Sequence, residues 1–184
     1  VAFCAATLVT LLNVKCVPHL QMLVRPAISI LKAINDYLFG KKNEVDETKR
    51  QSFQLITLAI IRTLVAVAEN IPQFLIPFVE ILLDRDCLPT IKVSQNTNEE
   101  GEAITSMTER LEEAIATKAP IHQLVPTLHK AIKKSSQNGG GAKFEWKVCL
   151  SILRILKVSI SKSSRNELSP LVGKILNALV QIYA

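Results

Sequence analysis

The side chains most able to do chemistry in this sequence are basic ones near its end. Residues 118–184 contain eleven Lys and Arg but only two acids, whereas residues 93–117 contain six acids and one Arg. Such a concentration of positive charge attracts phosphate backbones and acidic protein surfaces. The candidate basic interaction surface consists of Lys130, Lys133, Lys134, Lys143, Lys147, Arg154, Lys157, Lys162 and Arg165.

Two interpretations of these bases are open. Lys143, Lys147, Arg154 and Lys157 are spaced 4, 7 and 3 residues apart, which allows one stripe on a helix and therefore a binding surface. Alternatively, the bases only solvate the outside of an apolar helical protein. The nearby aromatic residues, Phe144 and Trp146, fit core positions, so stacking on nucleic-acid bases is not indicated.

No pattern for catalysis is present. The chain has no GxGxxG, P-loop, HExxH or nucleophile-elbow motif, and the GGGAK at 139–143 lacks the Walker spacing. The cysteines have no CxxC spacing and the histidines form no ligand set; these residues are Cys4, Cys16, Cys87, Cys149, His19, His122 and His129. We therefore expect reduced thiols and no enzyme activity, cofactor, metal site or small-molecule substrate.

An apolar segment with a central proline occurs four times, as VRPAISIL, LIPFVEIL, LVPTLHKA and LSPLVGKI. Each copy has an apolar residue two positions before the proline, and Pro26, Pro77, Pro126 and Pro170 are 51, 49 and 44 residues apart. An apolar helical segment precedes each copy. This period is close to the roughly 40–47 residues of HEAT and armadillo repeats. The pattern predicts an all-α fold, an α-solenoid of about four HEAT-like helical hairpins.

The expected organisation is one repeat array over residues 1–184. Its units are about 1–40, 47–84, 104–134 and 142–184, with flexible loops at 85–103 and 135–141. Capping boxes of the form S-x-x-E are expected to start helices at Ser106 and Ser164. Leu128 and Leu176 are expected between helices in the core. Because both ends of the chain lie inside apolar helical pattern, we expect a fragment of a longer protein.

The hydropathy of the chain raises the question of a membrane span. The chain is 48% hydrophobic, but the best candidate, residues 55–68, is short and has Arg62 in its middle. A spanning helix needs roughly 20 apolar residues. An arginine at the bilayer centre costs about 2.5–3.5 kcal/mol. We therefore expect no membrane partner and a segment buried by other helices.

Three stretches resemble a known family. They are NVKCVPHLQMLVRPAISILKAI (13–34), AENIPQFLIPFVEILL (68–83) and LEEAIATKAPIHQLVPTLHKAIKKS (111–135). They are similar to the C-terminal part of the large HEAT-repeat U3 small nucleolar RNA-associated proteins of the small-subunit processome. In the third stretch the similarity lies in AIATKAP followed by LVP.

The resemblance implies a nuclear, nucleolar scaffold in pre-ribosomal RNA transcription and processing, without catalytic residues. Its implied partners are protein subunits of a large ribonucleoprotein assembly, with pre-rRNA or snoRNA backbone as a further candidate. Two alternatives stand beside it. One is a HEAT or armadillo peptide-binding adaptor of the transport-receptor or phosphatase-scaffold type. The other is a direct RNA-backbone binder that uses the basic C-terminal third.

Overall fold

The structure, a computed structural model, describes residues 2–12, 15, 17–39, 47–84, 87–88, 99–138 and 146–183. Over these residues the regular secondary structure is helical and contains no strand. This confirms the predicted all-α class. The helices share one continuous apolar core, which extends from Val9 near the start of the chain to Ala178 near its end.

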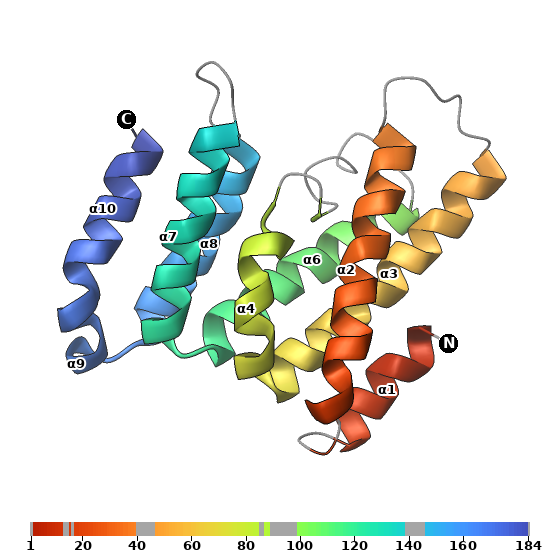
Figure 1. Ribbon diagram of the computed structural model, residues 1–184, viewed down its shortest axis with the longest axis horizontal. Helices are drawn as coiled ribbons and strands as arrows, with labels where there is room; N and C mark the ends of the chain where they lie inside the picture. The colour runs from red at the N-terminus through yellow and green to blue at the C-terminus, as the bar shows by residue number, and fades with distance from the viewer. Residues whose placement is uncertain are drawn as a thin grey trace.

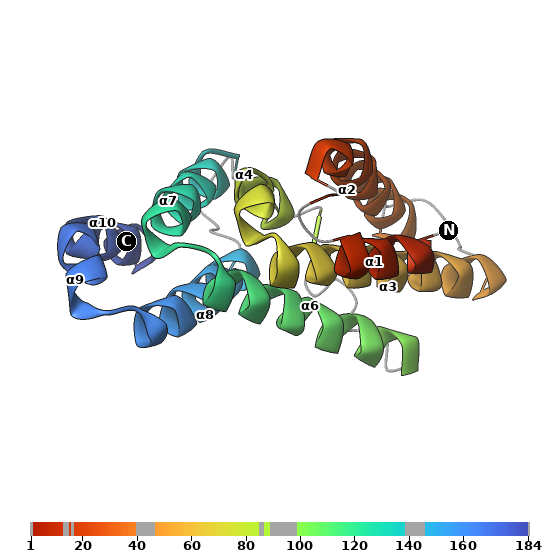
Figure 2. The same ribbon diagram turned by 90° about the horizontal axis from the view of Figure 1, so that it is seen from below.

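The helices lie in two layers (Figures 1 and 2). In the first layer, neighbours contact each other in the order α1 (Ala2–Leu12), α3 (Glu47–Asn70), α6 (Glu99–Lys118) and α8 (Trp146–Lys162). In the second layer the order is α2 (Val17–Phe39), α4 (Pro72–Leu82), α7 (Ile121–Asn138) and α10 (Val172–Tyr183). Short α9 (Arg165–Leu168) and the 3-10 turn η2 (Ser169–Leu171) lead into α10. Figure 1 places α10 and the N-terminal helices at opposite ends.

Short turns carry the chain from the first layer to the second. Ile71 alone separates α3 from α4, and Ala119 and Pro120 separate α6 from α7. The amide of Ile71 still donates to the carbonyl of Val67 at 2.7 Å, and that of Ala119 donates to the carbonyl of Ile115 at 3.0 Å. Because the turns are so short, each first-layer helix must pack near the second-layer helix that follows it.

The four repeated prolines all belong to the second layer. Pro26, Pro77 and Pro126 lie inside α2, α4 and α7, and Pro170 lies in η2. A proline removes one helical hydrogen bond because it has no amide hydrogen. Pro26 and Pro77 are exposed, so water can reach that side of the helix.

The apolar residues around the first three prolines are buried, as the repeat predicts. The positions two before and two after these prolines are all at most 5% exposed; they are Val24, Ile28, Leu75, Val79, Leu124 and Leu128. The fourth copy differs, because Leu168 is half-buried and Val172 is 49% exposed. The short 3-10 turn there changes the helical register, and the last segment buries Leu171, Ile175 and Ala178 instead.

The prediction that Leu176 is a core residue is therefore wrong. Its side chain is 56% exposed, whereas Leu128 is fully buried as predicted. The main packing partner of α10 is α7, so only one narrow side of α10 is covered. Leu176 follows the buried Ile175 by one residue, which turns it about 100° around the helix and away from α7.

The helices of the unit predicted at 104–134 extend into both predicted loops. The helix pair covers residues 99–138, and both loops are therefore shorter than expected. Helix α6 begins at Glu99, inside the predicted loop 85–103, and α7 continues to Asn138, inside the predicted loop 135–141. The first turn of α6 holds Glu99, Glu100 and Glu102, whose charge favours a helix N-terminus. The parts of these loops at 85–86, 89–98 and 139–141 lie outside the described residues, as does the predicted helix start at 142–145.

One of the two predicted capping boxes is confirmed. The amide of Glu167 donates to the Ser164 hydroxyl at 3.4 Å, and the amide of Ser164 donates to the Glu167 carboxylate at 2.8 Å. This backbone hydrogen bond lowers the pKa of the Glu167 carboxyl. The prediction for Ser106 is wrong, since Ser106 lies exposed in the middle of α6.

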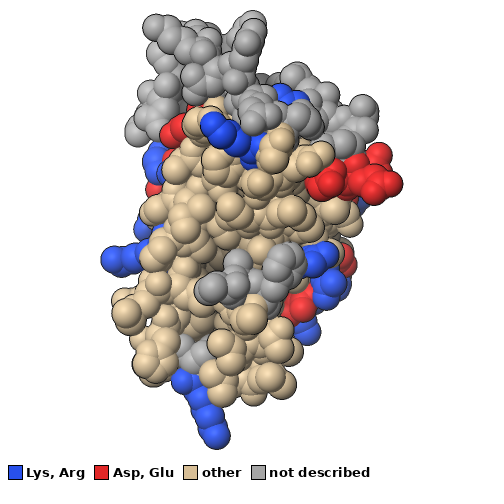
Figure 3. All heavy atoms as spheres, turned by 90° about the vertical axis from the view of Figure 1, so that its right-hand side faces the viewer, with Lys and Arg blue, Asp and Glu red and all other residues tan. Residues whose placement is uncertain are grey.

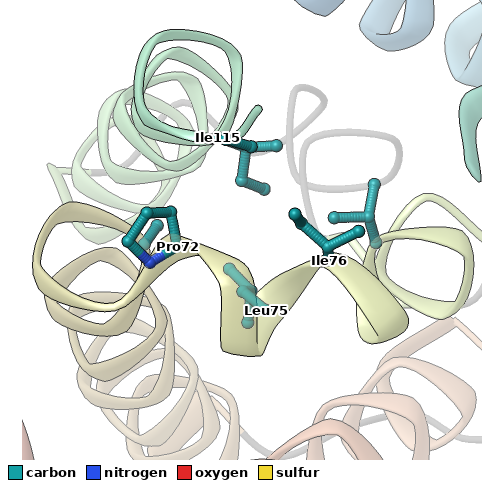
Figure 4. Close-up of a pocket in the computed structure, with 7 residues that line it drawn as sticks. Pro72, Leu75, Ile76 and Ile115 are labelled. Carbon is teal, nitrogen blue, oxygen red and sulfur yellow. The ribbon is translucent and has the colours of Figure 1, made fainter. Parts of the chain in front are cut away.

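Helix α3 accounts for the apolar candidate span. Among the described residues it is the one helix long and apolar enough to cross a membrane by length and composition. However, α1, α4 and α6 pack around it, and 67% of its most apolar window is buried inside the protein. Where α3, α4 and α6 meet, Pro72, Leu75, Ile76 and Ile115 close the seam and leave no room for a water molecule (Figure 4).

Replacing Leu128 and Leu176 by alanine tests this assignment of core and surface. Leu128→Ala should lower the free energy of unfolding by about 2–5 kcal/mol, because it leaves a cavity in a packed core. Leu176→Ala should change it by less than about 0.5 kcal/mol, as expected of an exposed side chain. Urea unfolding followed by circular dichroism measures both values, and equal costs for the two variants would contradict the described packing.

Candidate interaction surface

The described members of the candidate basic surface lie on both layers. Lys130, Lys133 and Lys134 lie on α7 in the second layer, whereas Arg154, Lys157 and Lys162 lie on α8 in the first layer (Figure 2). Arg165 begins α9, where the chain returns to the second layer. Lys143 lies outside the described residues, and Lys147 lies in the first turn of α8, where its side chain is not described. The structure thus separates the bases into two groups on different layers.

Two of the bases are paired with acids. Lys134 lies 3.5 Å from a carboxylate oxygen of Asp84 and 3.9 Å from one of Glu80. Arg154 lies 3.4 Å from a carboxylate oxygen of Glu109. Their charge is therefore partly neutralised at the surface.

Four bases keep an exposed charge, with no ion pair to another described residue. They are Lys130, Lys157, Lys162 and Arg165. Lys162 and Arg165 lie close together in the chain around the capping box at Ser164, so three of the four lie between the middle of α8 and the start of α9. The exposed positive charge is thus smaller and more local than the sequence indicates.

The acids that pair with these bases belong to a regular set of contacts between neighbouring helices. In the first layer, both Nε and Nη2 of Arg110 on α6 donate to one oxygen of Glu69 on α3, at 3.0 and 2.8 Å. The Glu109 to Arg154 pair then joins α6 to α8. In the second layer, Lys32 on α2 lies 3.3 Å from Asp84, which follows α4.

Sequence reasoning missed these pairs, although a signal was present. Glu69 and Glu109 are 40 residues apart, and Arg110 and Arg154 are 44 apart, close to the spacing of the repeated prolines. An acid and a base that each recur at the repeat period become neighbours when the repeats stack. Charge runs along a single helix do not reveal such pairs, because the partners lie at equivalent positions of different units.

Two hollows flank the first-layer ion pairs. One, of about 230 Å³, lies between α3 and α6 beside Arg62, Glu69 and Arg110. The other, of about 350 Å³, lies between α6 and α8 and is lined by Glu109, Glu112, Glu113, Arg154, Ile155 and Val158. Both are open grooves bordered by charged side chains rather than enclosed chambers.

Glu112 is the one acid of the second hollow that is buried. Glu112 is only 5% exposed, and the hydroxyl of Ser151 on α8 donates a hydrogen bond to its carboxylate. Burial raises the pKa of the Glu112 carboxyl above its ordinary 4.5, although the Ser151 hydrogen bond and the charge of Arg154 act in the opposite direction. Glu112 thus joins α6 to α8 beneath the exposed Glu109 to Arg154 pair.

Three of the four cysteines belong to the described residues. Cys87 and Cys149 are buried, Cys4 has an exposed thiol, and Cys16 lies outside the described residues. Burial raises the pKa of the Cys149 thiol to about 11, so at neutral pH it is protonated and a poor nucleophile. Among the described residues, no group of three or more His, Cys, Asp and Glu side chains could hold a metal ion.

Apolar side chains are also exposed, most of them on α1, α2 and α10, and the others, Leu55, Ile56 and Leu150, on α3 and α8. Figure 3 shows the end formed by the N-terminal helices, where a broad area is free of described charged side chains. The exposed apolar residues of α1 and α2 are Leu8, Leu11, Leu12, Met22 and Ile30. At the other end, α10 exposes Val172, Leu176 and Val180.

Comparison of the chain with protein-family models, with curated proteins and with solved structures finds no match in any of the three.

The buried carboxyl of Glu112 makes a prediction about pH. The folded-state pKa of this carboxyl lies above the ordinary 4.5 of the unfolded chain. Between pH 4.5 and that raised pKa the folded protein therefore binds more protons than the unfolded chain, so stability falls as the pH rises through this interval. Glu112→Gln keeps the oxygen that accepts from Ser151 but cannot ionise. Its melting temperature should therefore exceed that of the wild type at pH 7, and the gain should shrink as the pH is lowered toward 4.5.

Thermal melts across this pH range measure the difference. Glu113→Gln, at an exposed neighbouring acid, is the matched control and should show little change at any pH. A Glu112→Gln variant that is less stable than the wild type by the same amount at every pH would contradict the desolvated carboxyl.

Proposed function

We propose that this chain is a HEAT-type α-solenoid that acts as a non-catalytic scaffold in nucleolar small-subunit ribosome assembly and binds assembly-factor proteins. The solenoid is supported by the fact that the proline-marked segments occupy equivalent places in the second-layer helices. Three of them place their proline inside a second-layer helix and bury the residues two before and two after it. The same local sequence thus makes the same contact in successive helices, as stacked repeats require.

The nucleolar assignment is supported by the resemblance of residues 13–34, 68–83 and 111–135 to the U3 small nucleolar RNA-associated HEAT-repeat family. These stretches correspond to α2, the α3–α4 turn with α4, and the α6–α7 turn with its flanking helices, so each lies within one expected unit. The open, charge-bordered grooves of the first layer fit a protein-binding role. Protein subunits of a ribonucleoprotein assembly are the proposed partners.

A second candidate is direct binding of an RNA backbone. Its support is the group of exposed bases Lys157, Lys162 and Arg165. A protein that neutralises phosphates loses affinity steeply as salt rises, with a slope of roughly −0.7 per phosphate for single strands. The split of the remaining bases between layers, and the pairing of Lys134 and Arg154, make this surface small.

The peptide-binding adaptor receives less support. A peptide groove of that type uses the same polar residue at matched positions of successive repeats. The position three after each proline is instead Ser29, Glu80, His129 and Gly173. No common side chain is available at this position to bind a peptide backbone along the array.

Affinity purification from nucleolar extract tests the scaffold. The tagged chain should enrich small-subunit assembly proteins, and the same proteins should remain after RNase treatment. In parallel, the triple variant Lys157→Glu, Lys162→Glu, Arg165→Glu should keep these partners. The control Lys15→Glu, Lys49→Glu, Lys130→Glu has an equal change of charge at exposed bases elsewhere.

The RNA-backbone function would replace the scaffold if RNase removed every partner and if the Lys157, Lys162, Arg165 variant, but not its control, also lost them. Failure to enrich any small-subunit assembly protein before RNase would contradict the nucleolar assignment.

A further inference from the structure

The hollow between α6 and α8 carries an excess of negative charge. Three carboxylates, those of Glu109, Glu112 and Glu113, line it together with one guanidinium, that of Arg154. Arg154 lies 3.4 Å from Glu109, so Glu112 and Glu113 have no ion pair to another described residue. The hollow between α3 and α6 has the opposite excess, because two guanidiniums and one carboxylate line it. The two hollows of the first layer therefore differ in the charge of the group that each can accept.

The three glutamates occupy positions that belong to the core in the preceding first-layer helix. The amide of Ile71 donates to Val67 after α3, and the amide of Ala119 donates to Ile115 after α6. These matching hydrogen bonds align α6 with α3 at an offset of 48 residues, from 71 to 119 and from 67 to 115. With this offset the residues of α3 that correspond to Glu109, Glu112 and Glu113 are Ile61, Leu64 and Val65, all at most 4% exposed.

The acids at these positions keep the space between α6 and α8 open to polar groups. Glu109 and Glu113 are exposed, so α8 does not close over this side of α6. Glu112 is buried, and its described hydrogen-bond partner is the neutral hydroxyl of Ser151. Arg154 also acts on Glu112, but it is shared with Glu109. A buried carboxylate without its own countercharge is costly, and a cation that enters the hollow would stabilise it.

One wall of the hollow is apolar. Ile155, which is 1% exposed, and the half-buried Val158 form this wall from α8. A fitting ligand therefore combines an apolar stem with a cationic end, as arginine and lysine side chains do. The planar guanidinium of arginine donates to carboxylates in a fixed fork, which the compact ammonium of lysine cannot do. A metal ion fits less well, because these carboxylates do not form a group that could hold one.

The position of the hollow favours a partner protein as the source of the arginine. Helix α6 already has α3 on one side and α8 on the other, so a helix added at either end of the array would not cover the groove (Figure 2). Sites for small molecules enclose most of the ligand surface, which an open groove does not. An arginine carried by a protein gains further contacts around the rim of the groove.

From this charge, packing and shape we infer that the groove between α6 and α8 is a binding site for an arginine side chain of a partner protein. The guanidinium lies against the carboxylates of Glu112 and Glu113, and the aliphatic stem lies against Ile155 and Val158. This inference rests on the proposed scaffold function and deepens it by naming a side chain that the partner presents.

Methyl NMR of the 184-residue chain with N-acetyl-arginine methylamide tests the inference. This blocked arginine should shift the methyl signals of Ile155 and Val158. It should leave unchanged those of Val65 and Met107, which line the hollow between α3 and α6. Blocked citrulline, which has nearly the same shape without the charge, should bind about tenfold more weakly or worse. Blocked lysine should also bind more weakly than blocked arginine.

Substitutions locate the site on α6. Glu112→Gln should weaken binding of blocked arginine about tenfold or more, because it removes the buried charge. Glu102→Gln is the matched control, since Glu102 is an exposed acid in the first turn of the same helix, and it should leave binding unchanged. Wild-type affinity should rise as the pH rises through the raised pKa of Glu112, and this rise should be absent in Glu112→Gln. Circular dichroism checks that both variants are folded.

Several outcomes would overturn the inference. They are the absence of shifts at Ile155 and Val158, equal binding of citrulline or lysine, and unchanged affinity in Glu112→Gln. Tighter binding of free arginine than of blocked arginine would assign the groove to a small molecule instead. These measurements use neither extract nor RNase. If assembly proteins are enriched from extract but blocked arginine does not bind, the arginine site alone fails and the scaffold stands.

Discussion

Helix α3 cannot be stable unless other helices cover it on several sides, and the rest of the molecule follows from this requirement. Ala59, Ile61 and Val67 are each at most 2% exposed, and at 100° per residue they point in three different directions around the helix. Burying a side chain of valine or leucine size stabilises a fold by about 1.5–3 kcal/mol. Helices α1 and α6 cover α3 within the first layer, and α4 covers it from the second. Each of these helices has a further apolar side of its own, which must in turn be buried by the next helix of the array.

Local patterns in the sequence predicted the interior helices well, because proline position and apolar periodicity act within one helix. They placed α2, α3 and α4 within a few residues and marked Val24, Leu75 and Leu124 as repeated features. The error at Leu176 arose because its apolar environment depends on a neighbouring helix rather than on α10 itself. The error at Ser106 has a similar cause. A Ser-x-x-Glu sequence fits an exposed helix interior as well as a helix start, and Gly101 and Ile104, which lie upstream of Ser106, are buried by contacts with other helices.

The candidate surface was harder to predict than the fold. Net charge and spacing identify which residues are basic, but not which acids neutralise them. Arg154 meets Glu109 across 45 residues of sequence, and Lys134 meets Asp84, which follows another helix of the second layer. The layers also separate bases that are close in sequence, because the chain crosses from α7 to α8. Only the three-dimensional stacking decides that Arg154 is paired with an acid while Lys157, Lys162 and Arg165 have no ion pair to a described residue.

The ion pairs between helices have a role that their energy alone does not explain. An exposed pair such as Glu109 to Arg154 contributes about 0.2–1 kcal/mol, far less than the apolar contacts beneath it. Apolar side chains alone, however, allow neighbouring helices to slide with little penalty, whereas a shift by one turn would separate Arg110 from Glu69, and a shift by two turns toward the start of α3 would bring it near Arg62. Repulsion of like charges thus disfavours the wrong register. The buried contacts hold the helices together, and the surface pairs set their alignment.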